Sequence, residues 1–175
     1  MEFAEVVRRR RMCRAYTDED VPDELVRSIL EVGLRSPSAG NTQPQEFIVV
    51  RDPAVKEELG RAAFGQTFLA EAPVVIAVVS DTRRSAARYR ERGVAFYSVV
   101  DGAFASLLLL LAAIDRGLGA AFVGAFDDER VASVLGLPPH VRPIGLIPVG
   151  HCADRPHALA RRGPDEIVHR DRYGS

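Results

Sequence analysis

The stretch "VAFYSVVDGAFASLLLLLAAI" (Val94–Ile114) constrains the fold more than any other part of the chain. It holds 21 residues with a single charge, Asp101. About 20 apolar residues suffice to span a bilayer, but a carboxylate near the middle of a span is costly in lipid. A helix that is apolar on all sides is also typical of a buried position. The stretch is therefore predicted to form a core helix or a helix at a subunit interface.

The rest of the chain predicts one α+β domain with few strands. A strand that is apolar on both faces and hence central is predicted at 73–81. Pro37 stops the second helix at Ser36, and the polar, arginine-rich residues 82–92 are expected to form a solvated connection or lid. Further helices are expected at 2–12, 22–36, 54–64, 94–116 and 128–136, and further strands at 46–52, 119–124 and 143–150.

Charge and motifs exclude several classes of function. The 23 basic and 24 acidic side chains nearly cancel, which argues against nucleic-acid binding. No GxGxxG or GxxxxGK[ST] motif occurs. Two cysteines, Cys13 and Cys152, without a CxxC motif argue against a disulfide framework and against a zinc site. Because the N-terminus lacks an apolar signal core, a cytoplasmic protein is expected.

A run of arginines ends the first predicted helix. Phe3, Val6, Val7 and Arg10 fall on one face, so Arg10 is predicted to point inward, where a cation needs an anion or a ligand. Arginine suits phosphate because its guanidinium donates two parallel hydrogen bonds. Arg10 and Arg14 are therefore predicted to contact a ligand. Arg8 and Arg9 are expected to be solvated.

Two loops offer further groups to a ligand. In "SPSAGNTQPQEF", Ser38 supplies a hydroxyl, Gly40 allows close approach of the backbone, and the Asn41 amide matches the donor and acceptor edge of a pyrimidine-like ring. In "FVGAF" (Phe122–Phe126), a strand ends at Gly124 and leaves backbone N–H groups for a ligand. An ordinary turn would explain the first loop equally well, and a simple strand-to-helix connection would explain the second.

The combination of motifs resembles the nitroreductase-like FMN-dependent oxidoreductase family. The matching segments are "RRMCR", "SPSAGNTQP", "SLLLLLAAIDRGLG", "FVGAFD", "LGLPPHVRPIGLIPVG" and "ARRGPDEIV", in this order. The resemblance implies a three-layer α+β fold with a small, mostly antiparallel central sheet flanked by helices. It also implies a single domain, 1–175, whose C-terminal arm, 155–175, is exchanged in a homodimer, with "DEIVHRD" as the exchanged edge strand.

The resemblance further implies which residues bind FMN at the subunit interface. One subunit would supply Arg10 and Arg11 to the phosphate and ribityl group, and Arg14 to the pyrimidine side of the ring. The partner subunit would supply the loop, while backbone N–H groups of Val123 and Gly124 would lie near flavin N5 and O4. The full set is Arg10, Arg11, Met12, Arg14, Pro37, Ser38, Ala39, Asn41, Val123, Gly124, Arg161 and Arg162.

The implied activity is ping-pong hydride transfer from NAD(P)H through FMN to a nitroaromatic, quinone or enone acceptor. No catalytic side chain and no metal are needed, because the cofactor supplies the chemistry. The chain departs from the family pattern at Met12, Gln45, Val123 and Ala160, and residues 60–93 are short where larger members carry substrate-covering helices. These departures leave alternatives open: oxygen-dependent flavin fragmentation, reductive dehalogenation, cofactor reduction, or non-catalytic flavin binding.

Overall fold

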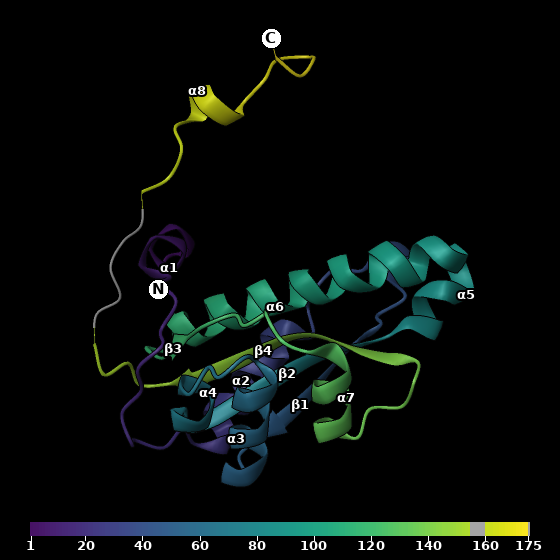
Figure 1. Cartoon of the computed structure of the whole chain (residues 1–175). Helices are drawn as coiled ribbons and strands as arrows, with labels where there is room; N and C mark the ends of the chain where they lie inside the picture. Colours follow the sequence, from purple (N-terminus) through teal and green to yellow (C-terminus); the bar gives the residue numbers. More distant parts are fainter. Residues whose placement is uncertain (155–159, 175) are drawn as a thin grey trace.

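A four-stranded antiparallel sheet forms the centre of the computed structural model, which describes residues 1–154 and 160–174 (Figure 1). The strands are β1 (Gln45–Val50), β2 (Val74–Asp81), β3 (Gly119–Ala120) and β4 (Val141–Gly150), in the order β1-β2-β4-β3. Every residue of β2 is buried, so the prediction of a central strand is confirmed.

Helices cover both faces of this sheet because side chains of β2 alternate between two apolar clusters. Val74, Ile76 and Val78 pack with α2 (Asp23–Gly33) and α6 (Ser98–Asp115). Val75 and Ala77 pack with α3 (Pro53–Ala62), α4 (Phe68–Glu71) and α7 (Asp128–Leu135). The result is the three-layer α+β architecture that was predicted.

Helix α6 lies along one face of the sheet, as Figure 1 shows. The helical run Thr82–Asp115 is long and apolar enough to cross a membrane by length and composition. However, Arg90 breaks the run with non-helical backbone angles, and a π-helical turn, η2 (Gly93–Tyr97), precedes α6. Leu109 and Asp101 are buried within the protein. The inner side of α6 therefore belongs to the core, as predicted, whereas Phe104 and Leu107 on its other side are about half exposed.

Residues 82–92, predicted to be a solvated connection or lid without a stated secondary structure, form a helix, α5 (Thr82–Arg92). The Asp81 carboxylate caps its first turn by accepting a hydrogen bond from the Arg83 backbone N–H at 3.0 Å. The helix is mostly exposed and offers little apolar periodicity, which is why the sequence pattern did not reveal it.

The N-terminal helix α1 (Phe3–Arg9) is shorter than predicted and does not turn its apolar stripe toward the chain's own core. Val6 is buried, but Phe3 is 73% exposed and Val7 is 45% exposed. The helix ends at Arg9, so Arg10 follows it as a half-buried cap residue. Arg10 is more buried than Arg8 and Arg9, which are exposed, and the inward direction predicted for its side chain stays a prediction.

The C-terminal arm also differs from expectation. Its described part contains a short helix, α8 (Pro164–Ile167), rather than the edge strand predicted for "DEIVHRD". Figure 1 shows this part extending clear of the sheet, and a strand requires a neighbouring strand to satisfy its backbone groups. The first part of the predicted arm, 155–159, lies outside the described residues.

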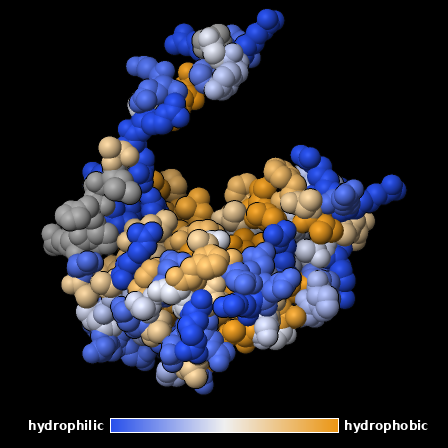
Figure 2. Space-filling model, viewed as in Figure 1, coloured by the Kyte–Doolittle hydropathy of each residue, from blue (hydrophilic) through white to orange (hydrophobic). Residues whose placement is uncertain are grey.

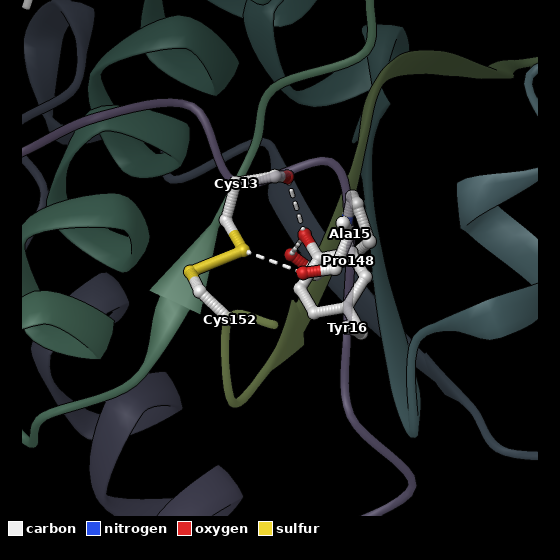
Figure 3. The surroundings of a disulfide bond; sticks show 5 residues. All are labelled: Cys13, Ala15, Tyr16, Pro148 and Cys152. Atoms are coloured by element: carbon white, nitrogen blue, oxygen red, sulfur yellow. Dashed lines mark hydrogen bonds between the residues drawn. A yellow bond between two sulfur atoms is a disulfide. The ribbon is translucent and has the colours of Figure 1, made fainter. Parts of the chain in front are cut away.

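Cys13 and Cys152 form a disulfide across 139 residues of sequence, contrary to the expectation from the cysteine count (Figure 3). Two cysteines without a CxxC motif carry no sign of their spatial proximity. Proximity arises because the segment after α1 runs beside β3 and the end of β4, with bridges between Met12 and Ala120 and between Tyr16 and Cys152.

Candidate functional site

The loop at 36–43 is more than a capped turn. It contains a 3-10 turn, η1 (Ala39–Asn41), and Gly40, Asn41 and Gln43 all adopt left-handed backbone angles, with φ of 55°, 56° and 47°. Such angles are uncommon for residues other than glycine and recur at ligand sites. The Ser38 hydroxyl oxygen accepts a hydrogen bond from the Gln43 backbone N–H at 2.9 Å, and the Gln43 side chain donates to the Asn41 amide oxygen at 3.0 Å. These contacts hold Ser38 and Asn41 in fixed positions.

Helices α6 and α5 both contact this loop. Asp101 Oδ1 accepts a hydrogen bond from the Ala39 backbone N–H at 3.0 Å, although Asp101 is only 1% exposed. Burial raises the pKa of the Asp101 carboxyl above its ordinary value. Gly40 packs closely on α5, because a Cβ there would lie 2.5 Å from the Arg88 side chain and 2.6 Å from the Tyr89 hydroxyl oxygen.

The sequence did not predict that Asp101 binds the loop. There, its charge served only as an argument against a membrane span. Its Oδ2 is buried and has no hydrogen-bond partner within residues 1–154 and 160–174. One carboxylate inside an otherwise apolar helix was the available signal, because a buried charge requires a partner.

Residues 8–14, called the arginine segment below, contact β3. The Cys13 backbone N–H donates to the Ala120 carbonyl oxygen at 3.1 Å, and Met12 Sδ accepts a hydrogen bond from the Phe122 backbone N–H at 3.4 Å. Arg11 Nη1 donates to the Arg8 and Arg10 carbonyl oxygens at 2.7 and 2.8 Å.

The other two cations of this segment are differently placed. The half-buried Arg10 and the exposed Arg14 donate no side-chain hydrogen bond to any other described residue. Of the three predicted cofactor arginines in this segment, Arg10 and Arg14 are therefore available to a ligand, while Arg11 is turned back onto the backbone.

The segment at Val123 and Gly124 differs from the prediction, because β3 ends at Ala120 rather than at Gly124 and Val123 forms an isolated bridge to Leu146. The Val123 backbone N–H donates to the Leu146 carbonyl oxygen at 2.9 Å, and Leu146 returns the same bond. Since that N–H is already used, it is not available to flavin N5 as predicted. Gly124 is exposed, and its N–H donates to no backbone carbonyl within the described parts of the chain. Val123 thus anchors the loop that presents Gly124.

The loop and the arginine segment lie toward opposite ends of α6 within one chain. Asp101, which holds the loop, and Asp115, whose carboxylate binds the N-terminal amino group at 2.7 Å, are fourteen residues apart. This separation corresponds to about 21 Å along a helix. A single chain therefore does not bring together the two groups of predicted cofactor residues.

The two predicted arginines of the arm are also apart from the arginine segment. Arg162 donates to the Glu166 carbonyl oxygen at 2.7 Å and lies 3.7 Å from the Glu166 carboxylate, so it pairs within the arm itself. Arg161 is exposed, and its side chain lies 3.4 Å from the Ala160 carbonyl oxygen, to which it donates. Pro37 is exposed at the start of the loop.

An open cavity of about 780 Å³ lies between the arginine segment and the end of β4. Its wall includes Arg9, Arg11, His151 and Cys152, and of the predicted cofactor residues it contains Arg11 alone. This cavity therefore contains neither the residues of the loop at 36–43 nor Gly124.

Comparison with known proteins agrees with this architecture. The model of the "Nitroreductase family" matches residues 7–68 and 62–151. The chain is 36% identical to a protein named NADH dehydrogenase from Thermus thermophilus, over 91% of each chain. It is 28% identical to an FMN reductase [NAD(P)H] from Bacillus subtilis, over 93% of this chain and 71% of that protein.

The solved structures include a nitroreductase family protein from Streptococcus pneumoniae. It is 30% identical to this chain and superimposes with a TM-score of 0.88, over 96% of this chain and 99% of that one. Together with the match to the family model over most of the sequence, these likenesses show that the chain belongs to the nitroreductase family.

Proposed function

We propose that the protein is an FMN-dependent oxidoreductase that takes its electrons from NADH or NADPH. Membership of the family supports this proposal, as does the likeness to a relative that is named an FMN reductase [NAD(P)H]. FMN held by the arginine segment and the loop at 36–43 would supply the hydride-transfer chemistry between the pyridine nucleotide and a nitroaromatic, quinone or enone acceptor, with the two substrates used in ping-pong order.

The observation that carries the proposal is the separation of the two groups of cofactor residues along α6. A second copy of the chain would place its own loop beside the arginine segment of the first, so that each cofactor site is completed by two subunits. In the homodimer, residues 1–175 act as one domain, with the arm at 155–175 lying over the partner.

The uncovered surface of the protein supports such a dimer. Phe104 and Leu107 on α6, and Phe3 on α1, are 46%, 49% and 73% exposed. Figure 2 shows hydrophobic side chains gathered in the hollow above α6, between α1 and α5. An exposed apolar patch of this kind marks an interaction surface, and a second α6 is the complementary occupant.

The residues present fit FMN. Arg10 and Arg14 offer guanidinium groups that no carboxylate in the described parts of the chain neutralises, as an anionic phosphate requires. In the loop, the Ser38 hydroxyl and the Asn41 side-chain NH₂ can donate to a polar ring edge. The exposed N–H of Gly124 adds a backbone donor.

Each group has a defined part in this scheme. Arg10 binds the phosphate, with Arg11 joining it after leaving its backbone carbonyls, and Arg14 holds a positive charge near the pyrimidine edge of the ring. Pro37, Ser38, Ala39 and Asn41 come from the other subunit and hold the ring edge, and Arg161 and Arg162 close over the phosphate from the arm. Met12 contacts Phe122 and positions the segment after β3 that presents Gly124.

The visible spectrum of the purified protein tests the proposal. After reconstitution with FMN, the flavin absorption should bleach under anaerobic addition of NADPH or NADH, and addition of a quinone or nitroaromatic should restore it. A protein that fails to bind FMN at micromolar concentration would refute the proposal. Binding without reduction by either nucleotide would indicate a flavin-binding protein that is not this enzyme.

A further inference from the structure

The Cys13–Cys152 disulfide joins the proposed cofactor segment to the end of a core strand. Its Cα atoms are 6.0 Å apart, within the range that a disulfide requires. Cys13 lies between Met12 and Arg14, inside the proposed cofactor segment, and Cys152 follows β4 directly. The link therefore joins the segment that is expected to bind phosphate to the end of a core strand.

The two sulfur atoms differ in accessibility. Cys13 is fully buried, and Gly119 packs so closely against both sulfurs that a Cβ there would overlap them. Cys152, in contrast, is half-buried and forms part of the wall of the 780 Å³ cavity. Of the two cysteines, only Cys152 therefore borders the cavity and is partly open to solvent, so an attacking thiol is expected to approach from the side of Cys152.

The charges around the cavity favour an anionic reactant. Arg9, Arg11 and His151 lie in its wall, and the carboxylate there among residues 1–154 and 160–174 is that of Asp154. Arg9 pairs with Glu5, and His151 lies 3.4 Å from a carboxylate oxygen of Glu19. Among the described residues, Arg11 donates to backbone carbonyls and pairs with no carboxylate. Guanidinium groups near a cysteine favour its thiolate and attract anions.

The surrounding structure tolerates both oxidation states. Tyr16 Oη donates to the Cys13 carbonyl oxygen at 2.7 Å, and the Ala153 backbone N–H donates to the Ala15 carbonyl oxygen at 2.9 Å. The Ala15 carbonyl oxygen also lies 3.3 Å from Cys13 Sγ, so it can accept a hydrogen bond from the reduced Cys13 thiol (Figure 3). These bonds keep the backbone of Cys13 and Ala15 in place when the disulfide opens, but they do not hold the side chains of Arg10 and Arg14.

We propose that Cys13 and Cys152 form a thiol–disulfide exchange site whose reactants are low-molecular-weight thiols with carboxylate or phosphate groups. The thiolate of the reactant attacks Cys152 Sγ, forms a mixed disulfide there, and releases Cys13 as a thiolate that takes up a proton. A second molecule of the same thiol attacks the reactant's sulfur in the mixed disulfide and releases Cys152. Two thiols are oxidised to one disulfide, and the protein gains two electrons and two protons.

The oxidation state also sets FMN affinity, a consequence that rests on the proposed function. The disulfide fixes the backbone between Arg10 and Arg14, whereas reduction lets these side chains sample more conformations before FMN binds. Ordering one such side chain on binding weakens affinity by about twofold to tenfold. The reduced protein should therefore have a correspondingly higher Kd for FMN.

Intact mass measurements test the exchange site directly. The full-length oxidised protein is incubated with 3-mercaptopropionate or 2-mercaptoethanol at equal thiolate concentration, then quenched with acid. The expected result is a mixed disulfide on Cys152, formed several times faster by the anionic thiol at low salt. Equal rates for the two thiols, addition at Cys13, or two free thiols after treatment with an oxidant would overturn the proposal.

One variant, a change of salt and two further thiols sharpen this test. Arg9→Gln, which alters no proposed cofactor contact, should reduce the advantage of the anionic thiol by up to about fivefold, and high salt should do the same. An unchanged preference in Arg9→Gln and at high salt would count against the charged cavity. Coenzyme A and glutathione then separate phosphate-bearing from carboxylate-bearing reactants, and the faster of the two identifies the preferred class.

Titration with FMN of the oxidised, reduced and Cys13→Ser/Cys152→Ser proteins completes the experiment. The double variant should bind FMN like the reduced protein and should ignore added thiol. Equal affinity of the oxidised and reduced proteins would overturn the coupling to the cofactor. If no state binds FMN, the proposed function fails, but the mass measurements still decide the exchange site.

Discussion

Substitution of Asp101 tests how much the contact between α6 and the loop at 36–43 stabilises the protein. Its carboxyl is buried on α6 and accepts a hydrogen bond from the Ala39 backbone N–H at 3.0 Å. Replacement by alanine removes the acceptor and leaves that N–H without a partner, at a cost of about 1–3 kcal/mol in the free energy of unfolding. For a domain of this size, the melting temperature should fall by about 2–12 °C.

The Asp101→Asn variant separates the hydrogen bond from the charge. Its amide oxygen can still accept from Ala39, but the side chain no longer titrates. Burial raises the pKa of Asp101 in the folded state above its value in the unfolded chain. The folded protein therefore binds more protons between the two pKa values, and its stability falls as the pH rises through that window.

Urea unfolding of the apoprotein from pH 4 to pH 8, followed by circular dichroism, measures both effects. We expect the wild type to lose stability relative to Asp101→Asn as the pH rises, while Asp101→Ala is less stable than Asp101→Asn throughout. Parallel curves for the wild type and Asp101→Asn would show that the carboxyl is not perturbed. Equal stability of the alanine and asparagine variants would show that the hydrogen bond from the Ala39 N–H to residue 101 does not stabilise the protein.

Four further predictions address the cofactor site, the dimer and the N-terminal segment. Arg10→Ala should raise the Kd for FMN about ten- to a hundredfold in a fluorescence titration, while the exposed control Arg8→Ala should leave it unchanged; equal effects would remove Arg10 from the site. Gly40→Ala should lower the free energy of unfolding by about 1 kcal/mol or more, because φ is positive there and α5 leaves no room for a Cβ; wild-type stability in urea would contradict this strain. Leu107→Glu should convert a dimer to monomers in size-exclusion chromatography with light scattering, and a dimer that persists would place the interface elsewhere. Tyr16→Phe should cost about 1–2 kcal/mol in thermal unfolding, since the Cys13 carbonyl oxygen loses its hydroxyl donor; an unchanged melting temperature would show that another donor replaces it.

Sequence alone determined those parts of the protein that depend on local pattern. The continuous apolar run at 73–81 predicted the central strand, because a strand buried on both faces needs apolar residues at every position. The long apolar stretch predicted α6, and Gly136 correctly marked the end of α7, where its left-handed backbone closes the helix. The ordered motifs also identified the family, since each lies on one continuous segment.

Tertiary structure decided the features that depend on contacts between distant segments. Only the fold brings Cys13 beside Cys152, uses the Val123 N–H in a bond to Leu146, and places Asp101 under Ala39. Each of these pairings joins residues at least 23 positions apart, and a pattern read along the chain contains no distance across it. The same reason applies to α1. Its apolar stripe is visible in the sequence, but the exposure of Phe3 and Val7 depends on where the helix lies relative to the rest of the chain.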